Sequence, residues 1–165
     1  MAQLASSKIT PCLWFDGEAE EAARFYVSQL PDSRIDRIQT NLIDTPAGKA
    51  GTVLVVEFTL AGQKMFAVNG GMRVPYTYAL SLHISCNDQA EIDRLWAAYS
   101  EGGKVEQCGW LQDRFGVYWQ IAPSALQDML ADPDAAKAQR VMAAMLQMVK
   151  FDIAGLEAAY RGRAA

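Results

Sequence analysis

The chain has 165 residues, of which 51% are apolar and 21% are charged, a composition typical of one globular domain rather than of a disordered segment. Its net charge is −4 and it has no cluster of basic residues, which argues against an electrostatic nucleic-acid binder. No run of about 18 apolar residues is present that could span a membrane. The N-terminus lacks the apolar stretch of a secretion signal, so we expect a cytoplasmic protein that binds neither nucleic acid nor membrane.

Cysteine and histidine are scarce. The three cysteines, Cys12, Cys86 and Cys108, are an odd number, lie far apart and form no CxxC pair. This pattern predicts neither a disulfide framework nor a structural zinc site. His83 is the single histidine, which rules out the HExxH motif and any site built from several histidines.

The first half of the chain predicts a strand, a helix and three more strands. Residues 9–15 combine β-branched, aromatic and aliphatic side chains and predict a strand that ends at Asp16-Gly17, where a helix can be capped. Apolar residues at helical spacing predict a helix within residues 17–31. Ala61-Gly62 separates two apolar runs and predicts a hairpin. The three later strands are expected over residues 33–43, 52–60 and 63–69.

The second half repeats this order. A strand is expected over residues 78–86, and Asp88 with Glu91 forms a capping-box pattern at the start of a helix. Short strands and a turn follow over residues 104–111, 113–116 and 117–122. The simplest description is two βαβββ units, over residues 8–69 and 78–122, within one domain that covers residues 1–165.

After Pro123 the composition becomes helical, and we expect a helical tail over residues 124–161. Asp132-Pro133 is expected to open its longest helix, with proline at the first position, and Asp152 to open the last one. The methionines of the tail predict packing in the core or at a dimer contact rather than an adaptable binding groove. They are Met129, Met142, Met145 and Met148.

Four segments of the chain carry a family resemblance. They are ITPCLWFDGEAEEAARFY, LAGQKMFAVNGG, CGWLQDRFGVYWQIAP and DPDAAKAQRVMAAMLQMVKFDIAGLEAAY. Together they resemble the PhnB-like branch of the vicinal oxygen chelate superfamily, a branch also labelled 3-demethylubiquinone-9 3-methyltransferase-like. The superfamily includes glyoxalase I, bleomycin- and fosfomycin-resistance proteins and extradiol dioxygenases. The resemblance implies an α+β fold in which two βαβββ modules form a curved mixed sheet around a cleft, followed here by C-terminal helices and commonly completed by a homodimer.

Many members of the superfamily hold a divalent metal in this cleft with His, Glu or Gln side chains from four strands. The resemblance places Thr10 and Ser81 at the two first-strand positions of this set. It places Gln120 at the last-strand position of the second unit, and residues 67–69 at the corresponding place in the first. Only Gln120 keeps a side chain of the family type, so we expect no metal site and no cofactor.

Alternation along the strands separates core positions from cleft positions. One face of the second unit's first strand is expected to pack beneath a helix, through Leu80, Leu82, Ile84 and Cys86. The opposite faces are expected to line a pocket with aromatic walls and a few polar points, which is typical of a small-molecule site. The predicted ligand-binding residues are Thr10, Trp14, Asn69, Ser81, Trp110, Tyr118 and Gln120.

His83 and Cys12 are the two candidate catalytic residues. Histidine exchanges a proton near neutral pH, so His83 is the candidate acid or base; the alternative is a histidine hydrogen-bonded within a half-buried strand. Cys12 is a candidate nucleophile if a cation activates its thiol, and an inert packed cysteine otherwise. A Cys12–His83 pair would suit nucleophilic catalysis, although only the family's pairing of modules brings the two together.

Three functions are compatible with the sequence. The favoured one is a metal-free protein that binds a small molecule, because four aromatic residues fall near the expected cleft: Trp14, Trp110, Tyr118 and Trp119. The second is a metal-dependent lyase, dioxygenase or transferase that uses Gln120, His83 and Cys12. The third is a methyltransferase using S-adenosylmethionine, which we favour least because the chain has no glycine-rich first turn of a doubly wound sheet.

Overall fold

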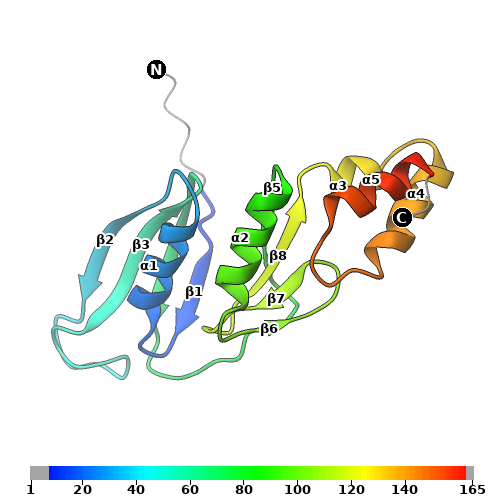
Figure 1. The fold of residues 1–165 in the computed structure, drawn as a ribbon. Helices are drawn as coiled ribbons and strands as arrows, with labels where there is room; N and C mark the ends of the chain where they lie inside the picture. Colours follow the sequence, from blue (N-terminus) through cyan, green and yellow to red (C-terminus); the bar gives the residue numbers. More distant parts are fainter. Residues whose placement is uncertain (1–7, 163–165) are drawn as a thin grey trace, which may run out of the picture. The chain divides into compact units, whose positions relative to one another are not determined.

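The structure is a computed structural model and describes residues 8–162. The chain divides into two compact units, residues 1–75 and 76–165, and each unit carries one four-stranded mixed sheet (Figure 1). We call residues 8–75 the first module, residues 76–123 the second module and residues 124–162 the tail. The fold is α+β, as the sequence predicts. No helix among the described residues is long and apolar enough to cross a membrane.

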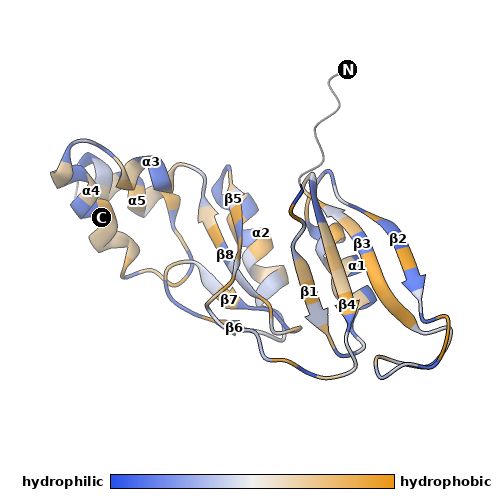
Figure 2. Ribbon diagram, turned by 180° about the vertical axis from the view of Figure 1, so that it is seen from behind, coloured by the Kyte–Doolittle hydropathy of each residue, from blue (hydrophilic) through white to orange (hydrophobic). Residues whose placement is uncertain are grey.

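The first module is a sheet with one helix on one of its faces. Its strands lie in the order β1-β4-β3-β2, with β1 parallel to β4 and the other pairs antiparallel. Figure 2 shows the apolar residues gathered along β3 and β4. Three alanines of the helix are fully buried, and their small side chains let the helix backbone lie close to the sheet. The elements are β1 (Cys12–Phe15), α1 (Ala19–Gln29), β2 (Arg34–Thr40), β3 (Val53–Leu60) and β4 (Gln63–Asn69).

The predicted hairpin at Ala61-Gly62 is confirmed. These two residues join β3 to β4, and both have positive φ, 46° at Ala61 and 80° at Gly62. A two-residue turn of this conformation matches the right-handed twist of the strands on either side. The turn therefore sets the register in which β3 and β4 pair.

The second module repeats the same plan, which confirms the predicted internal repeat. Its strands lie in the order β5-β8-β7-β6, again with the first and last strands parallel. Trp119 is a core residue here, because its ring packs on Tyr99 with 4.7 Å between ring centroids and its indole donates to buried Asp113. The expectation that Trp119 contributes to a ligand pocket was wrong. The elements are β5 (Leu82–Cys86), α2 (Gln89–Ser100), β6 (Lys104–Val105), β7 (Trp110–Gln112) and β8 (Tyr118–Pro123).

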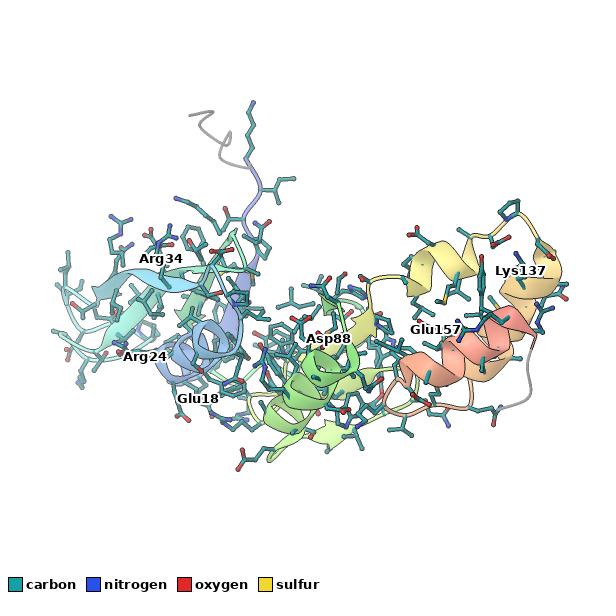
Figure 3. The ribbon with its side chains drawn as sticks, turned by 45° about the horizontal axis from the view of Figure 1, so that its top comes forward. Glu18, Arg24, Arg34, Asp88, Lys137 and Glu157 are labelled. Carbon is teal, nitrogen blue, oxygen red and sulfur yellow. The ribbon has the colours of Figure 1, made fainter. Side chains whose placement is uncertain are left out.

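The helices of the two modules are capped in different ways. Asp88 accepts a hydrogen bond from the Glu91 amide and the Glu91 carboxylate accepts one from the Asn87 amide, so the predicted capping box of α2 is confirmed. In α1 the cap comes from β4, since the Asn69 side-chain oxygen accepts from the amides of Gly17 and Ala19. Asp16 does not cap α1. Figure 3 labels Glu18 and Asp88 at the starts of these two helices.

Two strands begin later than predicted. The strand expected from residue 9 begins at Cys12, and the one expected from residue 78 begins at Leu82, because β-pairing with β8 starts there. Thr10 and Ser81 therefore precede their strands. Leu80 lies outside the strand and is 63% exposed, so its predicted place beneath a helix was wrong.

The tail forms three helices that join the second module. Segment 148–153 is hydrogen-bonded to the second module, since the amides of Cys108 and Gly109 donate to the carbonyls of Met148 and Val149. Asp152 caps the last helix, as predicted. The middle helix is capped by Asp134, so Pro133 lies before the cap and not at the first helical position. The helices are α3 (Leu126–Leu130), α4 (Ala135–Met145) and α5 (Ile153–Arg161).

Candidate functional site

Each sheet has one face packed on its helix and one face that carries no helix. We call the latter the open face of its module. Cys12 and His83 occupy equivalent places on the two open faces, since each lies three residues before the last residue of its strand, Phe15 or Cys86. Pairing across the strands then aligns two rows of side chains. They are Cys12, Phe66, Glu57 and Arg37 in the first module and His83, Gln120 and Trp110 in the second.

The predicted alternation is confirmed on both open faces. Trp14 and Cys12 are exposed while Leu13 and Phe15 are buried beneath α1. In the second module His83 is exposed and Ile84 and Cys86 are buried. The open faces therefore carry Cys12, Trp14 and His83, as the alternation predicts.

The open face of the second module carries an aromatic cluster. Tyr78, which precedes β5, packs on Tyr118 with 4.5 Å between ring centroids and on Trp110 with 6.0 Å. The Tyr78 hydroxyl donates to the Glu106 carboxylate, and this bond raises the pKa of Tyr78 to about 12. Tyr78 itself remains 58% exposed, so the cluster presents a ring to solvent.

Polar groups lie beside this cluster. The Gln120 amide donates to the Ser81 hydroxyl at 2.8 Å, and Gln120 is paired across the strands with His83. The Ser85 hydroxyl is 3.5 Å from Nδ1 of His83, at the long limit of a hydrogen bond. The imidazole and the amide oxygen thus lie next to an aromatic wall, an arrangement that can orient a small organic molecule.

The open face of the first module differs in character. Trp14 lies flat on Gly70, where an added Cβ would fall 1.7 Å from the ring, and its indole donates to the Met72 carbonyl at 2.9 Å. Beyond Phe66, the Glu57 carboxylate accepts hydrogen bonds from Arg37 and from the Gln39 amide. The Arg37 bond, first among several causes, lowers the pKa of Glu57.

Cys12 has the surroundings of an unreactive thiol. Partial burial raises the pKa of Cys12, which disfavours the thiolate that a nucleophile requires. The aligned residues on neighbouring strands, Phe66 and Glu57, bring no cation against the sulfur. Its role as a catalytic residue stays a prediction, as does that of His83.

The strands do not place two of the predicted binding residues, Asn69 and Thr10, on an open face. Asn69 is buried, with its side-chain oxygen on the start of α1 and its amide donating to the Val53 carbonyl at 3.0 Å. Thr10 is half-buried in the segment that precedes β1. A ligand role for either residue stays a prediction.

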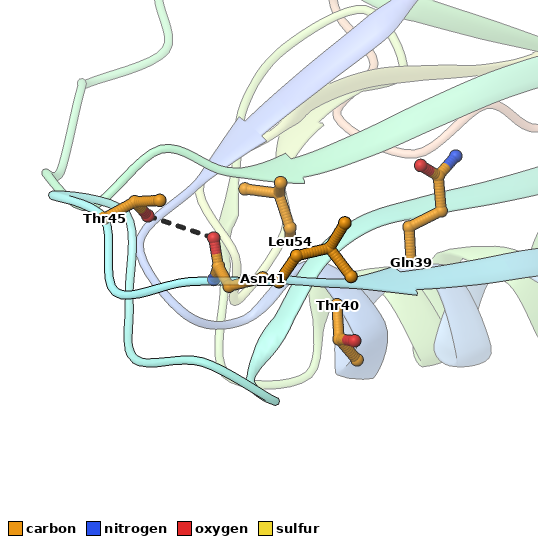
Figure 4. A pocket seen from close by; sticks show the side chains of 6 residues that line it. Gln39, Thr40, Asn41, Thr45 and Leu54 are labelled. Atoms are coloured by element: carbon orange, nitrogen blue, oxygen red, sulfur yellow. Dashed lines mark hydrogen bonds between the residues drawn. The ribbon is translucent and has the colours of Figure 1, made fainter.

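A hollow of about 490 Å³ lies at the end of β2, beside the loop that leads to β3 (Figure 4). Its shape depends on the β2–β3 loop, which is held by the Thr45 hydroxyl donating to the Asn41 side-chain oxygen at 3.0 Å. It is open and lined mainly by apolar surface. The lining residues are Gln39, Thr40, Asn41, Leu42, Thr45 and Leu54. The sequence analysis did not anticipate this hollow, since no motif marks it.

Comparison with known proteins identifies the family. A sequence model of the family described as 3-demethylubiquinone-9 3-methyltransferase matches residues 7–122. The structure is similar to a PhnB protein from Bacillus cereus, at 35% identity and a TM-score of 0.63, over 70% of this chain and 98% of that one. The chain belongs to the PhnB-like family, whose sequence model carries the 3-demethylubiquinone-9 3-methyltransferase description. No curated protein matches it significantly.

Two further structures resemble this PhnB-like chain. One, from Pseudomonas aeruginosa, has 23% identity and a TM-score of 0.54, over 72% of this chain and 98% of that one. Another is a fosfomycin resistance protein from Listeria monocytogenes, with 11% identity and a TM-score of 0.48, over 72% and 92% of the two chains. The family match ends at residue 122, so the tail lies beyond it.

The metal set expected of the superfamily does not fit the PhnB-like chain. At the expected ligand positions the second module has Ser81 and Gln120, joined by a hydrogen bond of 2.8 Å, and the first module has Thr10. The first-module counterpart of Gln120, expected within residues 67–69, is Phe66 in the strand register, and a phenyl ring cannot bind a metal. Within residues 8–162, no three His, Cys, Asp or Glu side chains are grouped so that they could hold a metal ion.

Three residues of the open faces were not predicted from the sequence. Tyr78 was assigned to a strand, whereas it precedes β5 and belongs to the aromatic cluster, where its hydroxyl donates to Glu106. Glu57 and Arg37 were passed over because a charged residue in a strand usually faces solvent. Their positions opposite each other on β3 and β2, which follow from the two predicted strands and the alternation, were the available signal.

Proposed function

We propose that this protein binds a small, aromatic or partly aromatic molecule on its open faces without a metal. The observation that carries the proposal is the aromatic cluster of Tyr78, Trp110 and Tyr118 beside the polar group of His83, Gln120 and Ser81. Aromatic walls with a few fixed polar groups are the usual composition of a small-molecule site. The unmatched ligand positions of the first module support a role that does not depend on a metal.

The test uses the full chain labelled with 5-fluorotryptophan, which gives each of the four tryptophans its own ¹⁹F signal. Indole is the probe, because it is aromatic and carries one N–H group. We expect indole to shift the Trp110 signal saturably and Tyr78→Ala to raise the midpoint at least about threefold, the effect of losing part of one aromatic contact. Trp96→Phe, on α2, is the matched control and should leave the midpoint unchanged.

Metal content is measured on the same untagged protein, purified without chelator. We expect well under about one zinc, nickel, manganese or iron ion per ten chains, and no uptake after soaking. Near-stoichiometric metal, or an unmoved Trp110 signal at saturating indole, would contradict the proposal.

A second candidate function is a metal-dependent enzyme of the same superfamily. One observation favours it: His83 and Gln120 are cross-strand neighbours, so two ligand-capable side chains do lie together. This function predicts bound metal and the formation of a product, with a loss of rate in a His83→Ala variant that still folds. Simple binding predicts that the ligand is recovered unchanged.

Methyl transfer, which the family description names, is the least favoured function. Enzymes that use S-adenosylmethionine most often have a doubly wound parallel sheet, whereas each sheet here has one parallel pair among its four strands. Calorimetry with millimolar S-adenosylmethionine decides the matter, and a saturable heat signal would restore this function.

We further propose that the protein is a homodimer and that the tail contributes to the contact. Met142, near the end of α4, and Leu146 and Val149, which follow that helix, are 49%, 51% and 44% exposed. Burying such side chains between two copies would remove apolar surface from water. Sedimentation equilibrium should show a dimer at micromolar concentration that Leu146→Glu dissociates, whereas a monomeric parent chain would refute the proposal.

A further inference from the structure

We infer that Glu57 on the open face of the first module recognises a hydrogen-bond donor on an uncharged aromatic ligand. This inference rests on the proposed function and names the chemical class of its ligand. It concerns the first module alone and a residue that sequence reasoning passed over.

The two oxygens of the Glu57 carboxylate differ in their hydrogen bonds. Arg37 donates to Oε1 from both Nε and Nη2, and the Gln39 amide donates to the same oxygen. Among the described residues no hydrogen bond reaches Oε2. The side chain of Glu57 is 23% exposed, so its second oxygen is an acceptor that the bonds to the first oxygen hold in place and that a ligand can reach.

The surroundings of this acceptor suit an aromatic body. Phe66 is next to Glu57 in the aligned row and is 36% exposed. In the neighbouring row Trp14 aligns with Val68 and Val55, and the ring of Trp14 is fixed against Gly70. A planar molecule on this platform would bury apolar surface and place its edge within reach of Glu57.

Local charge selects the kind of donor. Arg37 is paired with Glu57, and Lys64 lies two residues before Phe66 on β4, so two cations share the open face with one carboxylate. An ammonium group at Oε2 would meet this excess of positive charge, which weakens its attraction. A neutral hydroxyl or amide N–H forms a charge-assisted bond to the carboxylate without that repulsion. The class is therefore a neutral aromatic molecule with an O–H or N–H group.

The experiment compares phenol with anisole, its methyl ether, which has the same ring and no donor. In the chain labelled with 5-fluorotryptophan, the Trp14 signal reports on the first module and the Trp110 signal on the second. We expect the midpoint of the Trp14 shift to lie at least about fivefold lower for phenol than for anisole, the factor that one hydrogen bond to a charged group supplies. Glu57→Gln should reduce this preference below about twofold, because a neutral amide is a weaker acceptor.

Glu21→Gln, on the exposed side of α1, is the matched control and should keep the preference. Equal midpoints for phenol and anisole at Trp14 would overturn the inference. Tighter binding of benzoate than of phenol, lost in Arg37→Gln, would also overturn it by making the site one for anions. A shift of Trp110 without a shift of Trp14 would refute this inference and leave the proposed function standing, whereas an unmoved Trp110 signal with indole would refute the proposed function, on which this inference rests.

Discussion

The two modules share one backbone plan and differ in what their open faces carry. At equivalent places the first module has Cys12 and Phe66, and the second has His83 and Gln120. Glu57 in the first module corresponds to Trp110 in the second, because each pairs with the residue that precedes it in its row, Phe66 or Gln120. The aromatic ring and the polar side chain have thus exchanged places along the row: the ring comes before the carboxylate in the first module and after the amide in the second.

This exchange shows which interactions the repeat preserves. Both sheets keep a buried apolar face against a helix, since that face stabilises each module. The open faces do not share this constraint, so their side chains can diverge. A binding surface can be built on the open face of either module by itself.

We expect the largest difference between the modules in the free energy of unfolding that is lost when a buried polar side chain is removed. Asp113 in the second module accepts hydrogen bonds from the amides of Phe115 and Val117 and from the indole of Trp119. Asp113→Ala leaves these buried donors without their acceptor, and we expect a loss of about 4 kcal/mol in the free energy of unfolding. Urea denaturation followed by circular dichroism measures it.

Asn69→Ala in the first module is the comparison. It removes an acceptor from two helix-start amides and a donor to one carbonyl, and should cost about 2 kcal/mol. A larger cost for Asn69→Ala than for Asp113→Ala would reverse this ranking of the modules.

Two left-handed glycines sharpen the comparison further. Gly62 in the first module has φ +80° and open space around it, so Gly62→Ala should cost about 1 kcal/mol from the backbone alone. Gly109 has φ +75°, and an added Cβ would fall 2.4 Å from the Phe151 ring of the tail and 2.7 Å from the Ile121 carbonyl. Gly109→Ala should therefore cost about 3 kcal/mol in the same assay. Equal costs would show that the tail does not pack closely on the second module.

Local patterns predicted the scaffold, and contacts distant in sequence determined the rest. Alternation placed Cys12, Trp14 and His83 on open faces, and the Asp88–Glu91 spacing gave the cap of α2. The cap of α1 comes from Asn69, 50 residues beyond Ala19, so no window around the helix contains it. Tyr78 and Glu106 are 28 residues apart and meet only because the chain before β5 folds back over the sheet. Alternation along a strand predicts which face of the sheet a residue occupies. It does not predict which other segment of the chain packs on that face.

The Tyr78–Glu106 contact belongs to the second module and should be visible in a titration. The pKa of Tyr78 is raised to about 12, first by this bond, whereas an unfolded tyrosine ionises near pH 10. The stabilising contribution is therefore complete below about pH 10 and is lost as pH rises towards 12. Absorbance at 295 nm should show this late step, Tyr78→Phe should remove it, and Glu106→Gln should move it towards pH 10. A profile unchanged by Glu106→Gln would disprove the contact.

The smallest expected effect concerns Cys12, which stands where the second module has His83. Burial raises the pKa of Cys12, so its thiolate should form only above the ordinary range for cysteine. In a Cys86→Ala, Cys108→Ala background, we expect iodoacetamide to modify Cys12 slowly at pH 7 and with a midpoint above about 8.5, the value of a free cysteine. The same alkylation in denaturant provides the reference rate. Rapid modification at neutral pH would mean that a cation reaches Cys12 in solution, and it would make this residue a nucleophile after all. Slow modification would leave Cys12 as an unreactive residue of the open face. The ring of Phe66 and the carboxylate of Glu57 would then be the groups in its row that a ligand contacts.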